Sequence, residues 1–426
     1  MVKRLMCCML AASGAFAQGA PSAGEQFAQL LKRAKEARRA KDEKAMLATS
    51  LELARLLQYS GPATEQLALV YAEMGDQERA LQELHEFIAM GQCDDQLTTR
   101  PQFERLKSSP EFKQIVKDME ANKVPAEQAI RVAEFPDANL VPEDIDYDAQ
   151  SKSFLVTSVL EKKIVRMGLD GVEKDFAKAP DGWPMLAIKI DSRRGIVWAT
   201  EVALNNFASA PQKDWGRSAV LRFRLKDGSL TRKFDEPHAA LGDMALAPDG
   251  DAIVSDNDGG GVYRIRADAK SGGMERIDGG QFISPQTPAV EPDGRHIFVP
   301  DYAGGIGLLD AGTKQVRWIE ANRQHALQGI DGLYFTGETL IAAQNGTSPE
   351  RVVSFRLDAG LDRVASEEII ERSTLTLGDP THGVMVGDNF YYIANSGWDC
   401  LDDDGKLKPG AKMTPGLIMK AAKGHS

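Results

Sequence analysis

An aspartate and a histidine stand where their side chains could take part in chemistry. Asp331 lies between an isoleucine and a glycine inside an apolar stretch, where a charged group has to be paired or reach water. His382 opens a later stretch of the same kind, and an imidazole there could act as a general base. A lone histidine is also a common structural hydrogen-bonding group, so both roles stay open for His382.

Motifs that would define other catalytic classes are absent from the sequence. The 6 histidines show no close spacing typical of a zinc site, and there is no Gly-x-Ser-x-Gly nucleophile elbow. No glycine-rich run is followed by a helical pattern, so a loop that cradles phosphate is not expected.

Composition narrows the class of partner. The 426 residues carry 51 Lys and Arg against 62 Asp and Glu, a formal net charge of −11, which argues against nucleic acid because phosphate neutralisation needs basic patches. No apolar stretch reaches the roughly 18 residues of a membrane helix, so no transmembrane segment is expected. A chain of this length is expected to form two or three domains.

The second half of the chain repeats a unit made mostly of strands. Beyond Pro136, short runs of Val, Ile, Phe and Tyr alternate with polar residues and are separated by Gly, Asp and Asn turns. Equivalent positions recur at gaps of 43, 56, 44, 44 and 51 residues, at Asp148, Asp191, Ala247, Glu291, Phe335 and Val386. Six such units predict a six-bladed β-propeller over 130–421.

A propeller must close its ring, because one blade cannot bury both of its faces alone. The segments Ala129–Phe135 and Gly416–Ala421 could each supply the closing strand, and we expect both ends to contribute. Two long insertions, Leu204–Ser218 and Asp399–Pro415, are candidate lids over the central channel.

The first part of the chain, 25–122, is helical in its periodicity and poor in glycine. Within 62–90 it resembles a tetratricopeptide repeat, whose packing positions would be Ala68, Tyr71, Gly75, Ala80, Leu84 and Phe87. The overall fold class is therefore multidomain, an α-helical repeat domain followed by an all-β domain. The resemblance implies a groove for a peptide or protein partner, and the alternative is a helical spacer packed on the propeller.

The extreme N-terminus predicts export. Residues 1–17 combine Lys3 and Arg4, an apolar centre and a small-x-small cleavage site, as in a secretory signal peptide. The protein is expected to be secreted or periplasmic. Cys93 and Cys400 would remain after cleavage, either bridging the two halves or as two free thiols.

The blade texture resembles the six-bladed senescence marker protein/gluconolactonase superfamily over about 135–420, in the segments PEDIDYD, APDGDAIVSDN, EPDGRHIFVPDY and GIDGLYF. Enzymes of that family hold one divalent cation, usually Ca²⁺ or Zn²⁺, at the channel mouth. The resemblance implies Glu143 and Asp331 as ligands, with Asp243 and Gln286 at the middle positions where the family's asparagines are missing. In such enzymes a nearby carboxylate activates water, a role in which Asp331 is the candidate; His382 is the second candidate catalytic residue, from its place at the start of the sixth unit.

Two functions follow from these patterns. The first is a binding protein whose channel recognises a small molecule and whose helical domain recognises a partner. The second is a metal-dependent lactone or ester hydrolase. If Glu143, Asp331 and one further predicted residue converge at the channel mouth, the hydrolase is favoured. Asn345-Gly346-Thr347 is a glycosylation sequon, meaningful only in a eukaryotic source.

Overall fold

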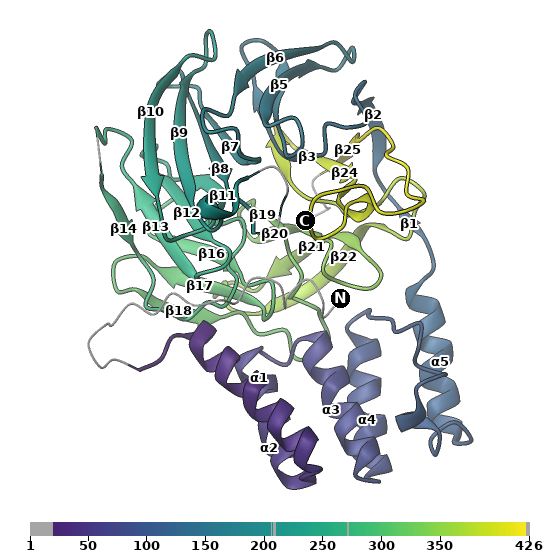
Figure 1. The fold of residues 1–426 in the computed structure, drawn as a ribbon. Coiled ribbons are helices and arrows are strands. Elements are labelled where there is room, and N and C mark those ends of the chain that lie inside the picture. The colour runs from purple at the N-terminus through teal and green to yellow at the C-terminus, as the bar shows by residue number, and fades with distance from the viewer. Residues whose placement is uncertain (1–19, 206, 208–209, 271, 423–426) are drawn as a thin grey trace.

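A computed structural model describes residues 20–205, 207, 210–270 and 272–422. The predicted signal peptide at 1–17 lies outside the described residues. A helical domain precedes six sheets arranged as a ring (Figure 1). The predicted fold class, helices followed by a six-bladed β-propeller, is confirmed.

Each blade is an antiparallel sheet whose first strand lies innermost. The first two blades comprise β3 (Pro142–Asp148), β4 (Ser153–Ser158), β5 (Lys163–Gly168), β6 (Glu173–Lys178), and β7 (Met185–Asp191), β8 (Ile196–Val202), β9 (Ser218–Arg224), β10 (Leu230–Glu236). The next two comprise β11 (Leu241–Leu246), β12 (Ala252–Asp256), β13 (Gly261–Ile265), β14 (Met274–Arg276), and β15 (Ala289–Val290), β16 (His296–Pro300), β17 (Ile306–Asp310), β18 (Gln315–Trp318). The fifth comprises β19 (Gly332–Phe335), β20 (Thr339–Gln344), β21 (Arg351–Leu357), β22 (Val364–Arg372) and the added edge strand β1 (Ala126–Glu127).

The sixth blade is built from both ends of the propeller. It comprises β23 (Gly383–Val386), β24 (Asn389–Asn395), β25 (Leu417–Ala422) and β2 (Ile130–Glu134). Ile130 pairs with Lys420 and Glu134 pairs with Leu417. Both segments predicted as closing strands therefore take part in closure.

The core of the propeller consists of the interfaces between neighbouring blades. Phe154 of the first blade packs with Ile393 of the sixth, and Trp198 of the second packs with Leu241 of the third. The innermost strands contact one another around a complete ring. All six predicted anchor positions lie at or directly after the ends of these innermost strands.

The helical domain comprises α1 (Ala23–Ala40), α2 (Glu43–Leu56), α3 (Gly61–Glu73), α4 (Gln77–Ala89) and α5 (Pro110–Asn122). Consecutive helices pack against each other. Gly75, at φ 80°, makes the turn between α3 and α4, a conformation that glycine adopts without steric cost. The predicted packing residues of these two helices, Ala68, Tyr71, Ala80, Leu84 and Phe87, share one buried cluster.

The helices dock on the loops of the third, fourth and fifth blades, and Figure 1 shows them side by side below the propeller, with α1 nearest β18 and α5 nearest β1. Arg323, between β18 and β19, forms ion pairs with Glu83 and Glu86 of α4. Its guanidinium lies 4.8 Å from the centre of the Tyr59 ring. The amide of Cys93 donates to the carbonyl of Ser348 at 2.6 Å. The two domains are thus joined by directed polar contacts.

The two cysteines are not bridged. Both are free thiols, with Cys93 buried in the helical domain and Cys400 partly exposed in a propeller loop. Burial raises the pKa of the Cys93 thiol to about 11. Of the two alternatives left by the sequence, the structure has the free thiols. Among the described residues, no helix is long and apolar enough to cross a membrane.

We predict that Arg323→Ala lowers the free energy of unfolding by about 1–3 kcal/mol, between the values typical of exposed and of buried ion pairs. Glu83, whose side chain is 11% exposed, would lose its cation. Urea unfolding of purified variants measures the change. Arg317→Ala is the matched control, because Arg317 pairs with Asp362 on the surface with 54% of its side chain exposed. Equal costs for the two variants would contradict the docking role of Arg323.

Candidate active site at the channel mouth

The predicted site residues all lie where innermost strands begin. Glu143 and Asp243 lie within the first three residues of β3 and β11. Asp331 and His382 directly precede β19 and β23, and Gln286 lies three residues before β15. The innermost strands of all blades run in the same direction along the channel, so they all begin at the same mouth. The structure brings all five residues into one connected group.

The centre of this group is formed by Glu143, Asp331 and His382. One oxygen of each carboxyl group and one ring nitrogen of the histidine lie within 4.8 Å of one another. Glu143 and His382 are buried, and Asp331 is partly exposed. Three polar groups thus converge from the first, fifth and sixth blades.

His382 is held by both ring nitrogens. Its Nδ1 lies 2.9 Å from the carbonyl oxygen of Glu143 and its Nε2 lies 2.6 Å from Oδ1 of Asp243. A carbonyl only accepts, so Nδ1 carries a proton. Although burial alone would lower it, the pKa of His382 is raised well above its ordinary value by the nearby carboxylates, Asp331 foremost. The imidazole is therefore a charged partner of Asp243 rather than a free base.

Asp243 and Gln286 are already satisfied by protein donors. Thr287 Oγ1 donates to Oδ1 of Asp243 at 2.9 Å, and Asn257 Nδ2 donates to Oδ2 at 2.5 Å. The same Asn257 amide donates to Oε1 of Gln286 at 2.8 Å. Despite burial, the His382 contact and these hydrogen bonds hold the pKa of Asp243 below its usual range. Asp243 therefore orients His382 directly, and Gln286 is linked to Asp243 through the Asn257 amide.

The positive charge near Glu143 and Asp331 is that of His382, which lowers the pKa of both carboxyl groups but is bonded to Asp243. Glu143 Oε2 accepts from the Trp398 indole at 2.5 Å, and Asp331 Oδ2 accepts from Asn345 Nδ2 at 2.8 Å. Burial raises the pKa of Glu143, and the negative charge of Asp331 raises it further. Burial, with the charges of Asp243 and Asp379, raises the pKa of Asp331 to about 6. Two like charges at low polarity are costly, and a bound cation would remove that cost.

The donor set fits a divalent cation. Glu143 and Asp331 offer the carboxylate oxygens that hard cations prefer, and the Nε2 atom of His382 could join them only after losing its proton and its contact with Asp243. Asp243 and Gln286 would support this centre as hydrogen-bonding neighbours, because their oxygens already accept from Asn257, Thr287 or His382.

Three site residues were missed from the sequence. Asn257 and Asn345 come directly after the second strands of their blades, β12 and β20, whereas asparagines were sought at the starts of the innermost strands. Asn345, noted only as part of a sequon, has its amide bonded to Asp331. The polar residue after a buried second strand was the available signal. No local pattern pointed to Trp398.

Both predicted lids reach this mouth. The insertion 204–218 joins β8 to β9, and the insertion 399–415 joins β24 to β25. Phe207 of the first packs against Trp398, with ring centres 5.9 Å apart, and against Leu401 of the second. Because Trp398 also binds Glu143, the two insertions and the central group form one packed unit.

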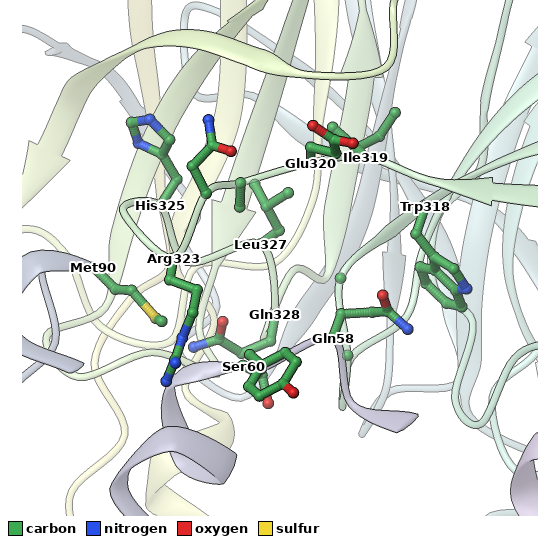
Figure 2. Close-up of a pocket in the computed structure, with 15 residues that line it drawn as sticks. Gln58, Ser60, Met90, Trp318, Ile319, Glu320, Arg323, His325, Leu327 and Gln328 are labelled. Carbon is green, nitrogen blue, oxygen red and sulfur yellow. The ribbon is translucent and has the colours of Figure 1, made fainter. Parts of the chain in front are cut away.

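A separate cavity of about 200 Å³ lies between the helical domain and the propeller (Figure 2). Its wall includes Gln58 and Ser60 from the helical side and Arg323, His325 and Gln328 from the propeller. Ser60 Oγ and Gln328 Oε1 are buried without a hydrogen-bond partner in the part of the chain that the structure describes. None of the central three residues lines it.

Comparison with known proteins yields similarity of shape only. No family model and no curated protein matches this chain. Similar solved structures include a protein described as a glucose dehydrogenase from Thermus thermophilus, with 17% identity, a TM-score of 0.48, and 69% of this chain and 99% of that chain covered. A calcium-binding regucalcin from Agrobacterium tumefaciens has 16% identity and a TM-score of 0.47, covering 69% and 96% of the two chains.

A gluconolactonase from Xanthomonas campestris has 12% identity and a TM-score of 0.43, covering 66% and 86% of the two chains. At this level of similarity the comparison says nothing about the residues of the channel. The six-bladed architecture rests on the strand pairing itself, and one architecture can host many reactions.

We predict that His382 stays protonated as the pH passes about 6.5, the ordinary value for histidine. Because its pKa is higher in the folded than in the unfolded protein, the ion pair with Asp243 stabilises the fold fully below that pH. The stabilisation is lost as the pH rises through the folded-state pKa. NMR shifts of the histidine rings in metal-free protein measure this.

The matched variant is Asp243→Asn, which keeps the shape but removes the charge facing Nε2. Its His382 should titrate at a lower pH than in the parent protein. Titration of His382 near 6.5 in both proteins would contradict the charged pair.

Proposed function

We propose that the protein is a metal-dependent hydrolase of lactones or esters that works at the mouth of the propeller channel. The observation that carries this proposal is the convergence of Glu143, Asp331 and His382 within 4.8 Å. The sequence suggests two functions, a binding protein and a hydrolase. This convergence favours the hydrolase.

Glu143 and Asp331 would hold the cation, with His382 beside them. A bound divalent cation would polarise a substrate carbonyl. Asp331, the partly exposed member of the group, is placed to take a proton from an attacking water. The indole of Trp398 donates a hydrogen bond to one oxygen of Glu143. This contact holds the carboxyl group in one orientation, so its other oxygen also has a defined position.

The surroundings favour an uncharged substrate. Asp243, Asp331 and Glu143 bring three negative charges, and the protonated His382 together with a divalent cation would offset them, so the loaded mouth would carry no net charge to attract an ionic substrate. Trp398, which is partly exposed and packs against Phe207 of one lid, offers an apolar surface beside it. A neutral lactone or ester with an apolar portion matches these features.

A second candidate function is ligand binding, favoured by the interdomain cavity with its unpartnered Ser60 and Gln328 atoms. A peptide or protein partner of the helical domain belongs to this candidate. Export to the periplasm or the exterior, expected from residues 1–17, is proposed for either function.

We predict that Glu143→Gln and Asp331→Asn each lower the rate of lactone hydrolysis at least about 100-fold, the range expected when a group acting in proton transfer or charge stabilisation is lost. Chelation of the parent protein should have a comparable effect. Hydrolysis of a panel of neutral lactones and aryl esters, followed by proton release, measures the rate.

The matched control is Glu291→Gln. Glu291 belongs to a second group of possible ligands with Asp293 and His296, at the opposite end of an innermost strand, and its change should leave the rate unaltered. Full activity in Glu143→Gln or Asp331→Asn, or no hydrolysis of any neutral lactone or ester by the metal-loaded parent, would overturn the proposal.

A further inference from the structure

A basic groove lies between the second and third blades, away from the channel mouth. Its wall is formed by the turns from β7 to β8, from β9 to β10 and from β13 to β14, together with the strand ends beside them. In an antiparallel blade these turns lie at the end opposite the starts of the innermost strands. The groove therefore belongs to the face of the propeller opposite the channel mouth. Its volume is about 380 Å³.

The groove gathers positive charge in an acidic protein. Five cationic side chains and one carboxylate line it: Arg194, Arg222, Arg224, Arg232, Lys270 and Asp268. The chain as a whole carries a net charge of −11, so the local charge has the opposite sign to the average.

Part of this charge is compensated and part is not. Arg194 pairs with Asp191 at 2.8 Å, Arg224 pairs with Asp227 at 3.2 Å, and Asp268 pairs with Arg266 at 3.3 Å. For Arg222, Arg232 and Lys270 there is no carboxylate partner among the described residues. Three positive charges therefore face the groove without an acidic neighbour bound to them.

Arg222 is held in place at the centre of this group. It pairs across strands with Trp198 on one side and Arg232 on the other, and its guanidinium lies 5.0 Å from the centre of the Trp198 ring. One terminal nitrogen donates to the carbonyl of Ala269 at 3.2 Å. Its Nε atom is buried and has no hydrogen-bond partner within the described part of the chain.

The neighbours of Arg222 leave it electrostatically unfavoured. Burial lowers its pKa, the positive charges of Arg232 and Arg194 lower it further, and the charges of Asp191 and Asp268 offset part of this. An anion placed between Arg222 and Arg232 would offset the remaining repulsion.

We propose that this groove is a binding site for a small molecule carrying a phosphate group, with Arg222 and Arg232 as the two anion-binding forks. Arginine recognises tetrahedral oxyanions through paired N–H donors. The volume matches a small-molecule pocket. Asp191, Asp227 and Asp268 flank the cations, and these carboxylates would repel an extended polyanion, so a compact ligand is favoured over a membrane surface or a nucleic acid.

Calorimetric titration of the full-length protein with inorganic phosphate, at constant ionic strength, tests the site. We expect binding with a dissociation constant of about 1 mM or tighter, and at least about tenfold weaker binding in Arg232→Gln and in Arg222→Gln. Arg232 is exposed, so its variant should fold normally even if Arg222→Gln disturbs the packing against Trp198.

Arg356→Gln is the matched control. Arg356 belongs to the fifth blade, is exposed and bonds to Ser366, and it does not line the groove. Its variant should bind phosphate as the parent does. No heat of binding with phosphate, or equal binding in Arg232→Gln and the parent, would overturn the proposal. Sedimentation with phosphatidylglycerol vesicles that depends on Arg232, without binding of free phosphate, would also overturn it.

Discussion

The closed ring of blades is the constraint on which the rest of the structure depends. Each blade buries its side chains against two neighbours, as Phe154 does against Ile393 and Trp198 against Leu241. No blade is complete without the next, so the pairing of β2 with β25 stabilises more than one sheet. The same closure brings the starts of six innermost strands to one mouth, where polar side chains from distant parts of the chain have to share a small volume.

That crowding determines the electrostatics of the site. His382 offsets the charge of Asp243, and Thr287 and Asn257 complete the partners of that carboxylate. Glu143 and Asp331 remain as two carboxyl groups with raised pKa values and only neutral donors, Trp398 and Asn345. A pair of this kind is costly as a permanent feature and useful as a cation site. The lids fit this interpretation, because they cover Glu143 through Trp398 and limit water around it.

The blades were predictable because their signal is local: alternating apolar residues and Asp-Gly turns specify hairpins, and the anchors from Asp148 to Val386 follow the ends of the innermost strands. The places of Glu143, Asp331 and His382 at the starts of innermost strands follow from the same local signal, whereas the ligand roles expected of Glu143 and Asp331 came from the family resemblance. Asn257, Asn345 and Trp398 could not be predicted, because their approach to the site depends on how second strands and a long loop pack in three dimensions. The docking of Arg323 on α4 joins residues about 240 positions apart, beyond any local pattern.

The most direct test of the account is whether the channel holds a divalent cation. Thermal and urea unfolding of EDTA-treated protein would be compared with and without Ca²⁺, Mg²⁺ and Zn²⁺, in the parent, Glu143→Gln and Asp331→Asn. A cation bound only by the folded protein at about 100 times its dissociation constant should stabilise it by about 2.7 kcal/mol. The account predicts this gain for the parent and its loss in both variants. No gain with any cation, or the same gain in the variants, would contradict it.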